Sequence, residues 1–317
     1  MKACSVEKER KHRTPRPSKR AGALLRRRGK DILAVIIVSL IIGAVAYSFL
    51  SPKGYTVDTT PKIAVVDQLS AQWPDPAFNQ TIFSILNQTG LQVDYYPSQD
   101  VTVNFYRTLA LHDYKLIIFR VHSTSETGST DLPPWVVFFT SENYSNTNYV
   151  SEQEDMRLVY VKFPDVSQLY FGITPTFVQN SMEGTFNGTT IIAMGCEGLN
   201  KTTMADAFIQ KGAKAFISFN GPVQEEYTDN ATVYLLRHLI TENQTIQDAV
   251  QETMNDVGAD PEYKSVLLYY PNNAGTNFLR LNATPTVTTP MVTTARRISK
   301  KNVGNSETTF VPSILTS

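Results

Sequence analysis

The sequence predicts an α/β domain built on a mostly parallel sheet of about six strands, behind one N-terminal transmembrane helix. Short apolar runs alternate with segments of helical periodicity, which is the pattern of parallel βαβ units. After Asp31, 19 residues pass without a charge, close to the ~20 that a helix needs to cross a bilayer. The 317 residues, 42% hydrophobic and 18% charged, suffice for one sizeable domain with appendages.

The first 50 residues indicate a signal anchor. Residues 1–30 hold 12 Lys/Arg and 2 Asp/Glu, whereas the rest of the chain holds 17 and 27. By the positive-inside rule the basic tail stays cytoplasmic, 31–50 cross the lipid bilayer and the main domain lies outside, at the cell surface. The alternative is a cleaved signal peptide ending near Ala46, but the apolar core is long for one. Because the basic residues form a short tail beside a membrane segment, we expect no nucleic-acid partner.

The elements of the outer domain follow from the spacing of apolar residues. Residues 51–61 read as a linker, 62–281 as the folded domain and 282–317 as a disordered Thr/Pro-rich tail. Short runs rich in β-branched and aromatic residues predict strands at 62–68, 91–96, 114–121, 191–194, 215–219 and 265–270. Apolar residues at helical spacing predict helices at 78–86, 103–111, 204–211, 232–239 and 246–257. A small antiparallel excursion (135–139, 158–163) and a short helix (175–182) are expected between the third and fourth strands.

Glycosylation sequons support the predicted topology independently, because all of them follow the membrane segment. The chain should therefore be a glycoprotein. The eight sequon asparagines are Asn79, Asn87, Asn143, Asn187, Asn200, Asn230, Asn243 and Asn282. The two cysteines, Cys4 and Cys196, are expected on opposite sides of the membrane, so they cannot pair. Cys196 is then either a buried, inert side chain or a nucleophile.

Cys196 and His122 are the candidate catalytic pair, because each follows a predicted buried strand. Ligand sites of open α/β sheets lie beyond the carboxyl ends of the strands. If the two strands are adjacent and parallel, the side chains project from ends ~5 Å apart. That geometry suits a thiol nucleophile with an imidazole that protonates a leaving amine, and a nearby imidazolium would lower the pKa of the thiol. The backbone N–H of Cys196 would stabilise an oxyanion. No nucleotide, serine-hydrolase or zinc motif is present, so we expect no cofactor and no metal.

Two runs, IIAMGCEGL (191–199) and MADAFIQKGAKAFISF (204–219), resemble the caspase-like clan of cysteine peptidases, which includes caspases, legumains, gingipains and the CHAT family. In that clan the nucleophile follows a hydrophobic strand and the histidine ends the preceding core strand, as in LIIFRVHS (116–123). The resemblance covers roughly 61–271. It implies a three-layer α/β/α sandwich and a cysteine endopeptidase, a hydrolase acting on peptides or proteins with a Cys196–His122 dyad.

The resemblance also implies roles for residues around the dyad. The oxyanion would be held by the backbone N–H groups of Cys196 and Ser123, and Asp67, Glu197 and Asn220 are candidates for the substrate pocket. Ser123 stands where the clan usually has glycine, and Met194 where members that prefer basic residues often have an acid. These departures leave open a catalytically inactive domain that binds a peptide or protein partner. A flavodoxin-like domain that binds a small ligand is a further alternative.

Overall fold

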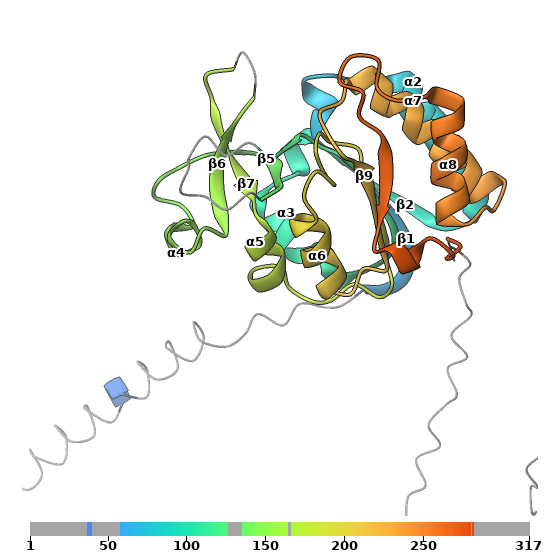
Figure 1. Cartoon of the computed structure of the whole chain (residues 1–317). Helices are drawn as coiled ribbons and strands as arrows, with labels where there is room; N and C mark the ends of the chain where they lie inside the picture. Colours follow the sequence, from blue (N-terminus) through green and yellow to red (C-terminus); the bar gives the residue numbers. More distant parts are fainter. Residues whose placement is uncertain (1–36, 40–57, 126–134, 164–165, 280, 282–317) are drawn as a thin grey trace, which may run out of the picture.

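The computed structural model describes residues 37–39, 58–125, 135–163, 166–279 and 281 (Figure 1). Its main sheet has six strands in the order β10-β9-β8-β3-β1-β2. The strands are β1 (Asp58–Asp67), β2 (Gln92–Pro97), β3 (His112–Arg120), β8 (Thr190–Ala193), β9 (Ala215–Phe219) and β10 (Leu267–Tyr270). Five of them run parallel, and β10 pairs antiparallel with β9 at one edge. The predicted α/β class with a mostly parallel six-stranded sheet is confirmed.

Helices pack on both faces of this sheet because the strands present alternate residues to opposite sides. Ala64 and Val66 of β1 lie in one apolar cluster, while Ile63 and Val65 lie in the other. The first face is covered by α3 (Val103–Thr108), α5 (Pro175–Asn180) and α6 (Thr203–Gln210). The second is covered by α2 (Pro76–Leu86), α7 (Glu225–Leu236) and α8 (Ile246–Val257) (Figure 1).

Side-chain caps define where several of these helices begin. The side chains of Asp75, Thr102, Thr174 and Thr245 each accept a hydrogen bond from the backbone N–H three residues later, at the starts of α2, α3, α5 and α8. Such a cap satisfies one of the free N–H groups of the first turn. The helix α7 begins seven residues before the predicted position. Its first turns are polar, and the sequence pattern does not show that Asp229 is buried there.

A second, four-stranded antiparallel sheet lies beside the main one and confirms the predicted excursion. Its order is β4-β5-β7-β6, and Figure 1 shows it beside α4 (Val150–Glu154) at one side of the domain. The strands are β4 (Ser123–Thr124), β5 (Val137–Asn143), β6 (Leu158–Lys162) and β7 (Leu169–Ile173). Sequence patterning misses β7, which contains a glycine next to its last residue. A Cβ on Gly172 would come within 2.6 Å of the side chains of Val137 and Val161, so the sheet requires glycine there.

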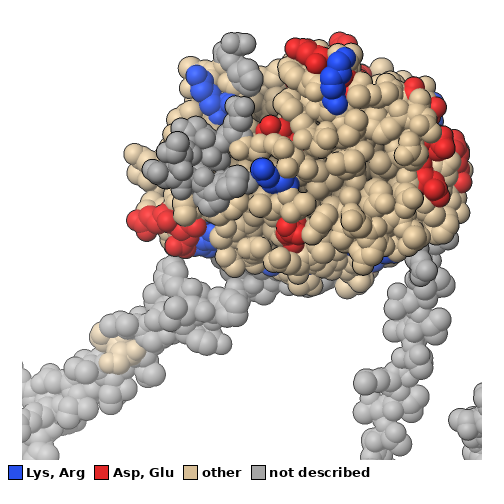
Figure 2. All heavy atoms as spheres, viewed as in Figure 1, with Lys and Arg blue, Asp and Glu red and all other residues tan. Residues whose placement is uncertain are grey.

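The charges on the domain surface are unevenly spread. Figure 2 shows acidic side chains gathered at the edge where α8 lies, whereas basic side chains on this face are scattered. The exposed acids Asp248, Glu252 and Asp256 recur every four residues along α8. Their spacing places them on one side of the helix, opposite its buried stripe.

The predicted anchor at 31–50 lies outside the described residues except for 37–39, which are helical. In the parts of the chain that the structure describes, no helix is long and apolar enough to cross a membrane. The predicted tails at 1–30 and 282–317 also lie outside the described residues, as do Cys4 and Asn282. The linker predicted to run to residue 61 ends earlier, because β1 already begins at Asp58.

Candidate active site

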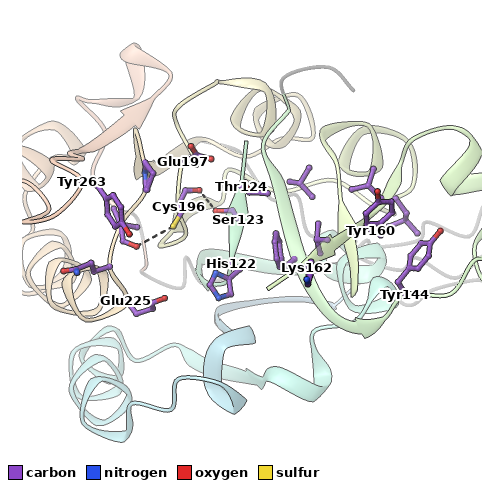
Figure 3. Close-up of a pocket in the computed structure, with 18 of the residues that line it drawn as sticks. His122, Ser123, Thr124, Tyr144, Tyr160, Lys162, Cys196, Glu197, Glu225 and Tyr263 are labelled. Atoms are coloured by element: carbon purple, nitrogen blue, oxygen red, sulfur yellow. Dashed lines mark hydrogen bonds between the residues drawn. The ribbon is translucent and has the colours of Figure 1, made fainter. Parts of the chain in front are cut away.

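Cys196 and His122 occupy equivalent positions on neighbouring parallel strands. In the β3–β8 ladder Phe119 lies opposite Ala193, and each candidate residue follows its strand partner by three positions. The expected adjacency of the two strands is therefore confirmed. Both side chains line one cavity of about 1110 Å³ (Figure 3). The main sheet thus brings a thiol and an imidazole to the same strand-end site, as parallel α/β sheets do with their ligand-binding residues.

Two contacts hold the ends of these strands together. The Ser123 hydroxyl donates a hydrogen bond to the backbone oxygen of Cys196 at 2.6 Å. Directly before the thiol, a Cβ on Gly195 would clash with the Ser123 hydroxyl oxygen and the Val121 carbonyl oxygen. Only glycine permits this close approach of the chain before Cys196 to the backbone on either side of His122.

Glu197 ties the chain after Cys196 to the chain after His122. Its backbone is left-handed, with φ of 61°. Its Oε2 accepts hydrogen bonds from the Ser125 backbone N–H at 2.6 Å and from the Ser125 hydroxyl at 2.8 Å. The Asn200 side-chain amide donates to the same hydroxyl at 2.9 Å. A non-glycine residue in this conformation is uncommon and marks a site that its surroundings hold in place.

Aromatic rings surround the His122 imidazole. Trp73 contacts it edge-on with ring centroids 4.9 Å apart, and the rings of Phe163 and Phe139 lie at 5.0 and 5.7 Å. Its Nε2 is buried and has no hydrogen-bond partner in the described structure. Burial, followed by the positive charge of Arg120, lowers the pKa of His122 to about 4. The imidazole is therefore neutral at pH 7.

The Cys196 thiol is half-buried and also neutral at rest. Its Sγ–H donates to the Val223 carbonyl oxygen at 3.6 Å, a bond drawn as a dashed line in Figure 3. Burial raises the pKa of this thiol, and the charges of Glu197 and Glu225 raise it further. The prediction that an imidazolium lowers the thiol pKa is wrong for the resting site, because the aromatic surroundings keep His122 uncharged.

The pH dependence of thiol alkylation should reveal this neutral resting state. We expect the rate of Cys196 alkylation by iodoacetamide to rise through an apparent pKa above the ordinary thiol value of ~8.5, because only the thiolate reacts. Between pH 5 and 8 the rate should keep falling with acidity, and His122→Ala should leave that trend in place. Mass spectrometry of the Cys196 peptide separates its labelling from that of Cys4. A fast plateau near pH 6 that disappears in His122→Ala would instead demonstrate a thiolate–imidazolium pair.

The remaining walls of the cavity come from two other regions. The small sheet contributes side chains from β5 and β6, including Phe139, Tyr160 and Lys162. Opposite them lie 222–225, which precede and begin α7, and 262–263, which precede β10. A volume of this size is that of a site for a sizeable ligand. The cavity therefore has room for several residues of an extended peptide.

Two of the three predicted pocket residues do not line this cavity. Asp67 is 1% exposed, and its Oδ1 accepts a hydrogen bond from Arg120 at 2.9 Å. Asn220 instead connects β9 to the chain before β10, because its side-chain oxygen accepts the backbone N–H of Val266 at 2.9 Å. Glu197 does line the cavity, and its Oε2 is taken up by two hydrogen bonds from Ser125.

A buried ion cluster around Arg120 was not predicted from the sequence. Arg120 is 2% exposed and forms a bidentate pair with Asp229 at 2.7 and 2.8 Å, besides its bond to Asp67. Burial opposes its charge, but the hydrogen bonds and charges of these two carboxylates outweigh burial and raise the pKa of Arg120. Arg120 also donates to the backbone oxygen of Trp73 at 3.0 Å. The signal for this cluster was the single charge inside the apolar run LIIFRVH.

Residues of the ion cluster, or residues next to it in the chain, also contact His122. Gln68, directly after Asp67, accepts the backbone N–H of His122 with its side-chain oxygen at 3.0 Å. Trp73, held by Arg120, contacts the imidazole. Arg120 therefore contacts Trp73 directly, and it bonds Asp67, the residue before Gln68.

Most of the described sequon asparagines are available at the surface. Asn79 is half-buried, and its amide lies 3.4 Å from both Asp67 and Tyr95 as a hydrogen-bond donor. The exposed sequon asparagines are Asn87, Asn143, Asn187, Asn200, Asn230 and Asn243. Exposure is what attachment of an oligosaccharide requires.

Comparison with known proteins does not identify a family for this chain. No protein-family model matches the chain, and no curated protein matches its sequence. A functional assignment therefore depends on the fold and on the geometry of the cavity that holds Cys196 and His122.

Proposed function

We propose that this chain is a membrane-anchored cysteine endopeptidase of the caspase-like clan, with its catalytic domain outside the cytoplasm. Cys196 is the nucleophile and His122 the general acid/base. The observation that carries the proposal is the alignment of these two residues, three positions beyond paired residues of adjacent parallel strands, at one large cavity. The order of the main sheet and the helices on both its faces are compatible with the clan's α/β/α sandwich.

In the proposed reaction the two neutral groups exchange a proton when substrate binds. The Cys196 sulfur attacks the scissile carbonyl carbon while its proton passes to His122. The oxyanion is stabilised by the backbone N–H groups of Cys196 and Ser123. The imidazolium then protonates the leaving amine as the C–N bond breaks, which leaves an acyl-enzyme. Water attacks the acyl carbon, gives its proton to His122 and releases the acid, and the proton returns to sulfur.

The low pKa of His122 is compatible with this role. An imidazole whose pKa is about 4 is a weak base, but its conjugate acid is a strong donor to the leaving nitrogen. The buried, unpartnered Nε2 is a polar atom that a substrate or transition state can satisfy. Substrate binding would also replace the weak thiol contact with the Val223 carbonyl.

Peptide turnover by the full-length protein in detergent tests the proposal. We expect the wild type to cleave members of a fluorogenic peptide library and Cys196→Ala to lose at least about 10⁴-fold in kcat/KM. The substitution removes the nucleophile but little volume, so the thermal unfolding midpoint should change little. Absence of cleavage of every peptide by the wild type, or cleavage that persists in Cys196→Ala, contradicts the proposal.

A second candidate function is peptide binding without cleavage. It is favoured by one observation, namely that the thiol is hydrogen-bonded to Val223 rather than to the imidazole. Under this alternative, peptides would bind the wild type and Cys196→Ala with equal affinity, and neither protein would cleave them.

A further inference from the structure

We infer that the cavity selects peptides that carry Arg or Lys directly before the cleaved bond, and that Glu225 is the specificity-determining residue. This inference rests on the proposed function, because it names the substrate class of the same site. Its basis is the charge of the cavity walls and the position of Glu225 relative to the thiol.

The ionised groups that line the cavity are mostly acidic. Glu197, Glu225 and Glu262 line it beside Cys196, whereas Lys162 is the single basic side chain among the described lining residues. His122 adds no positive charge at pH 7, since its pKa is lowered to about 4 by burial and then by Arg120. Lys162 belongs to β6, which is in the small sheet and not in the segments that carry the acids. The end of the cavity near the thiol is therefore negative.

Glu225 lies close to the thiol along the chain. The Cys196 Sγ contacts the carbonyl oxygen of Val223 at 3.6 Å, and Glu225 follows two residues later as the first residue of α7. Consecutive Cα atoms are ~3.8 Å apart, so the Glu225 Cα lies within roughly 10 Å of the reacting sulfur, and both residues line the same cavity. In the view of Figure 3, Glu225 and Tyr263 lie on the side of Cys196 that faces away from the small sheet, and both line the cavity.

Of the three acids that line the cavity, Glu225 is the one whose carboxylate has no hydrogen-bond partner in the described structure. Glu197 accepts two hydrogen bonds from Ser125, and Glu262 accepts one from the Gln224 side-chain amide at 2.6 Å. Within the described ranges, the Glu225 carboxylate accepts no hydrogen bond and forms no ion pair. It is half-buried, where an unpaired charge gains more from a cationic partner than it would on the open surface.

The chemistry of the wall favours a cationic side chain over a neutral or acidic one. A guanidinium or ammonium group would donate charge-assisted hydrogen bonds to the Glu225 carboxylate. The ring of Tyr263, on the same side of the cavity, offers a face for a cation. An acidic side chain would face Glu197, Glu225 and Glu262 together and be repelled.

An acid in the first turn of α7 also has a structural role, because negative charge stabilises the amino end of a helix. Glu226 provides the matched control. It is the next residue of the same helix, is exposed and does not line the cavity. Glu225→Gln and Glu226→Gln remove the same charge from the same turn of α7. A difference in substrate preference between the two variants therefore comes from the cavity and not from the stability of the helix.

The test uses full-length protein and peptides identical except for Arg, Lys, Gln or Glu before the cleaved bond. We expect the wild type to prefer Arg and Lys, and Glu225→Gln to lower the ratio of kcat/KM for the Arg peptide to that for the Gln peptide roughly tenfold. Glu226→Gln should match the wild type with all four peptides, and the preference for Arg should weaken as salt is raised. A wild type that prefers Gln or Glu, or an unchanged preference in Glu225→Gln, overturns the inference while the peptidase proposal stands.

A binding experiment keeps the two proposals separable. Fluorescent versions of the same peptides are titrated into Cys196→Ala protein and followed by anisotropy, which requires no catalysis. Tighter binding of the Arg peptide that is lost in Cys196→Ala/Glu225→Gln supports the inference even when no peptide is cleaved by the wild type. Equal affinity for Arg and Glu peptides overturns it. Thermal unfolding midpoints of the variants confirm that each is folded before these comparisons are made.

Discussion

Replacing Arg120 by methionine is expected to lower the free energy of unfolding by about 3–5 kcal/mol, because it leaves two carboxylates buried without their cation. Asp67 and Asp229 are 1% and 6% exposed, and both are hydrogen-bonded to Arg120. Asp67 retains a bond from the Tyr95 hydroxyl at 2.9 Å, whereas Asp229 loses both of its bonds from the guanidinium. Chemical denaturation at pH 7 measures the loss.

The pH dependence of this loss identifies its cause. In Arg120→Met the folded-state pKa of the Asp229 carboxyl, which burial already raises, should rise further above its unfolded value of ~3.9. The folded variant then binds more protons than the unfolded chain, so its stability relative to the wild type is recovered as the pH falls towards 4. Adding Asp67→Asn and Asp229→Asn to Arg120→Met removes the unpaired charges and should restore much of the stability at pH 7. A deficit that is independent of pH and persists in the triple variant would mean lost packing and not unpaired charge.

Replacing His122 by alanine is expected to lower kcat/KM for peptide cleavage by about 10³-fold, because proton transfer to and from the reacting groups is lost. Alkylation of Cys196 by iodoacetamide should continue in this variant, since the thiolate does not depend on an imidazolium. In the wild type, kcat/KM should fall below an apparent pKa near 4, where His122 becomes protonated and cannot accept the thiol proton. The acid limb should be absent from the residual activity of His122→Ala.

His112 supplies a matched control for that experiment. It lies at the opposite end of the same strand, is half-buried, and its Nδ1 is buried without a partner, as is the His122 Nε2. His112→Ala should therefore reproduce the effect on packing and retain peptide cleavage. A comparable loss of kcat/KM in both variants would indicate damage to β3 and not loss of an acid/base group.

The parts of the fold that the sequence predicts are those whose signal is local. The apolar runs of β1, β3, β8 and β9 are buried on both faces, so their composition alone predicts strands and their alternation with helices predicts parallel pairing. The first turns of α7 and the strand β7 were missed because their stability depends on distant partners. Asp229 is buried through Arg120, 109 residues earlier, and Gly172 fits a space left by Val137 and Val161.

The same distinction holds at the candidate site. Cys196 and His122 were found because each ends a strand that can be read from sequence. Their protonation states were not predicted, because the pKa values depend on burial and on contacts with Trp73 and Arg120 that form only in the folded structure. Asp67 was placed in the pocket by its position at a strand end, yet its partner Arg120 draws it into the interior. Glu225 was missed since nothing local marks the residues after β9 as a cavity wall.

The raised pKa of Cys196 has a consequence for how long such a nucleophile survives. Exchange with disulfides and attack on peroxides both proceed through the thiolate, so a protonated thiol is oxidised slowly. Cys196 is the free cysteine in the described part of the chain, and no second described thiol is there to reverse a sulfenic acid through a disulfide. Burial, helped by the charges of Glu197 and Glu225, raises the pKa of Cys196 and therefore slows the oxidation of a thiol that has no second described cysteine to restore it. In an oxidising compartment this thiol would stay reduced until a ligand displaces its contact with Val223.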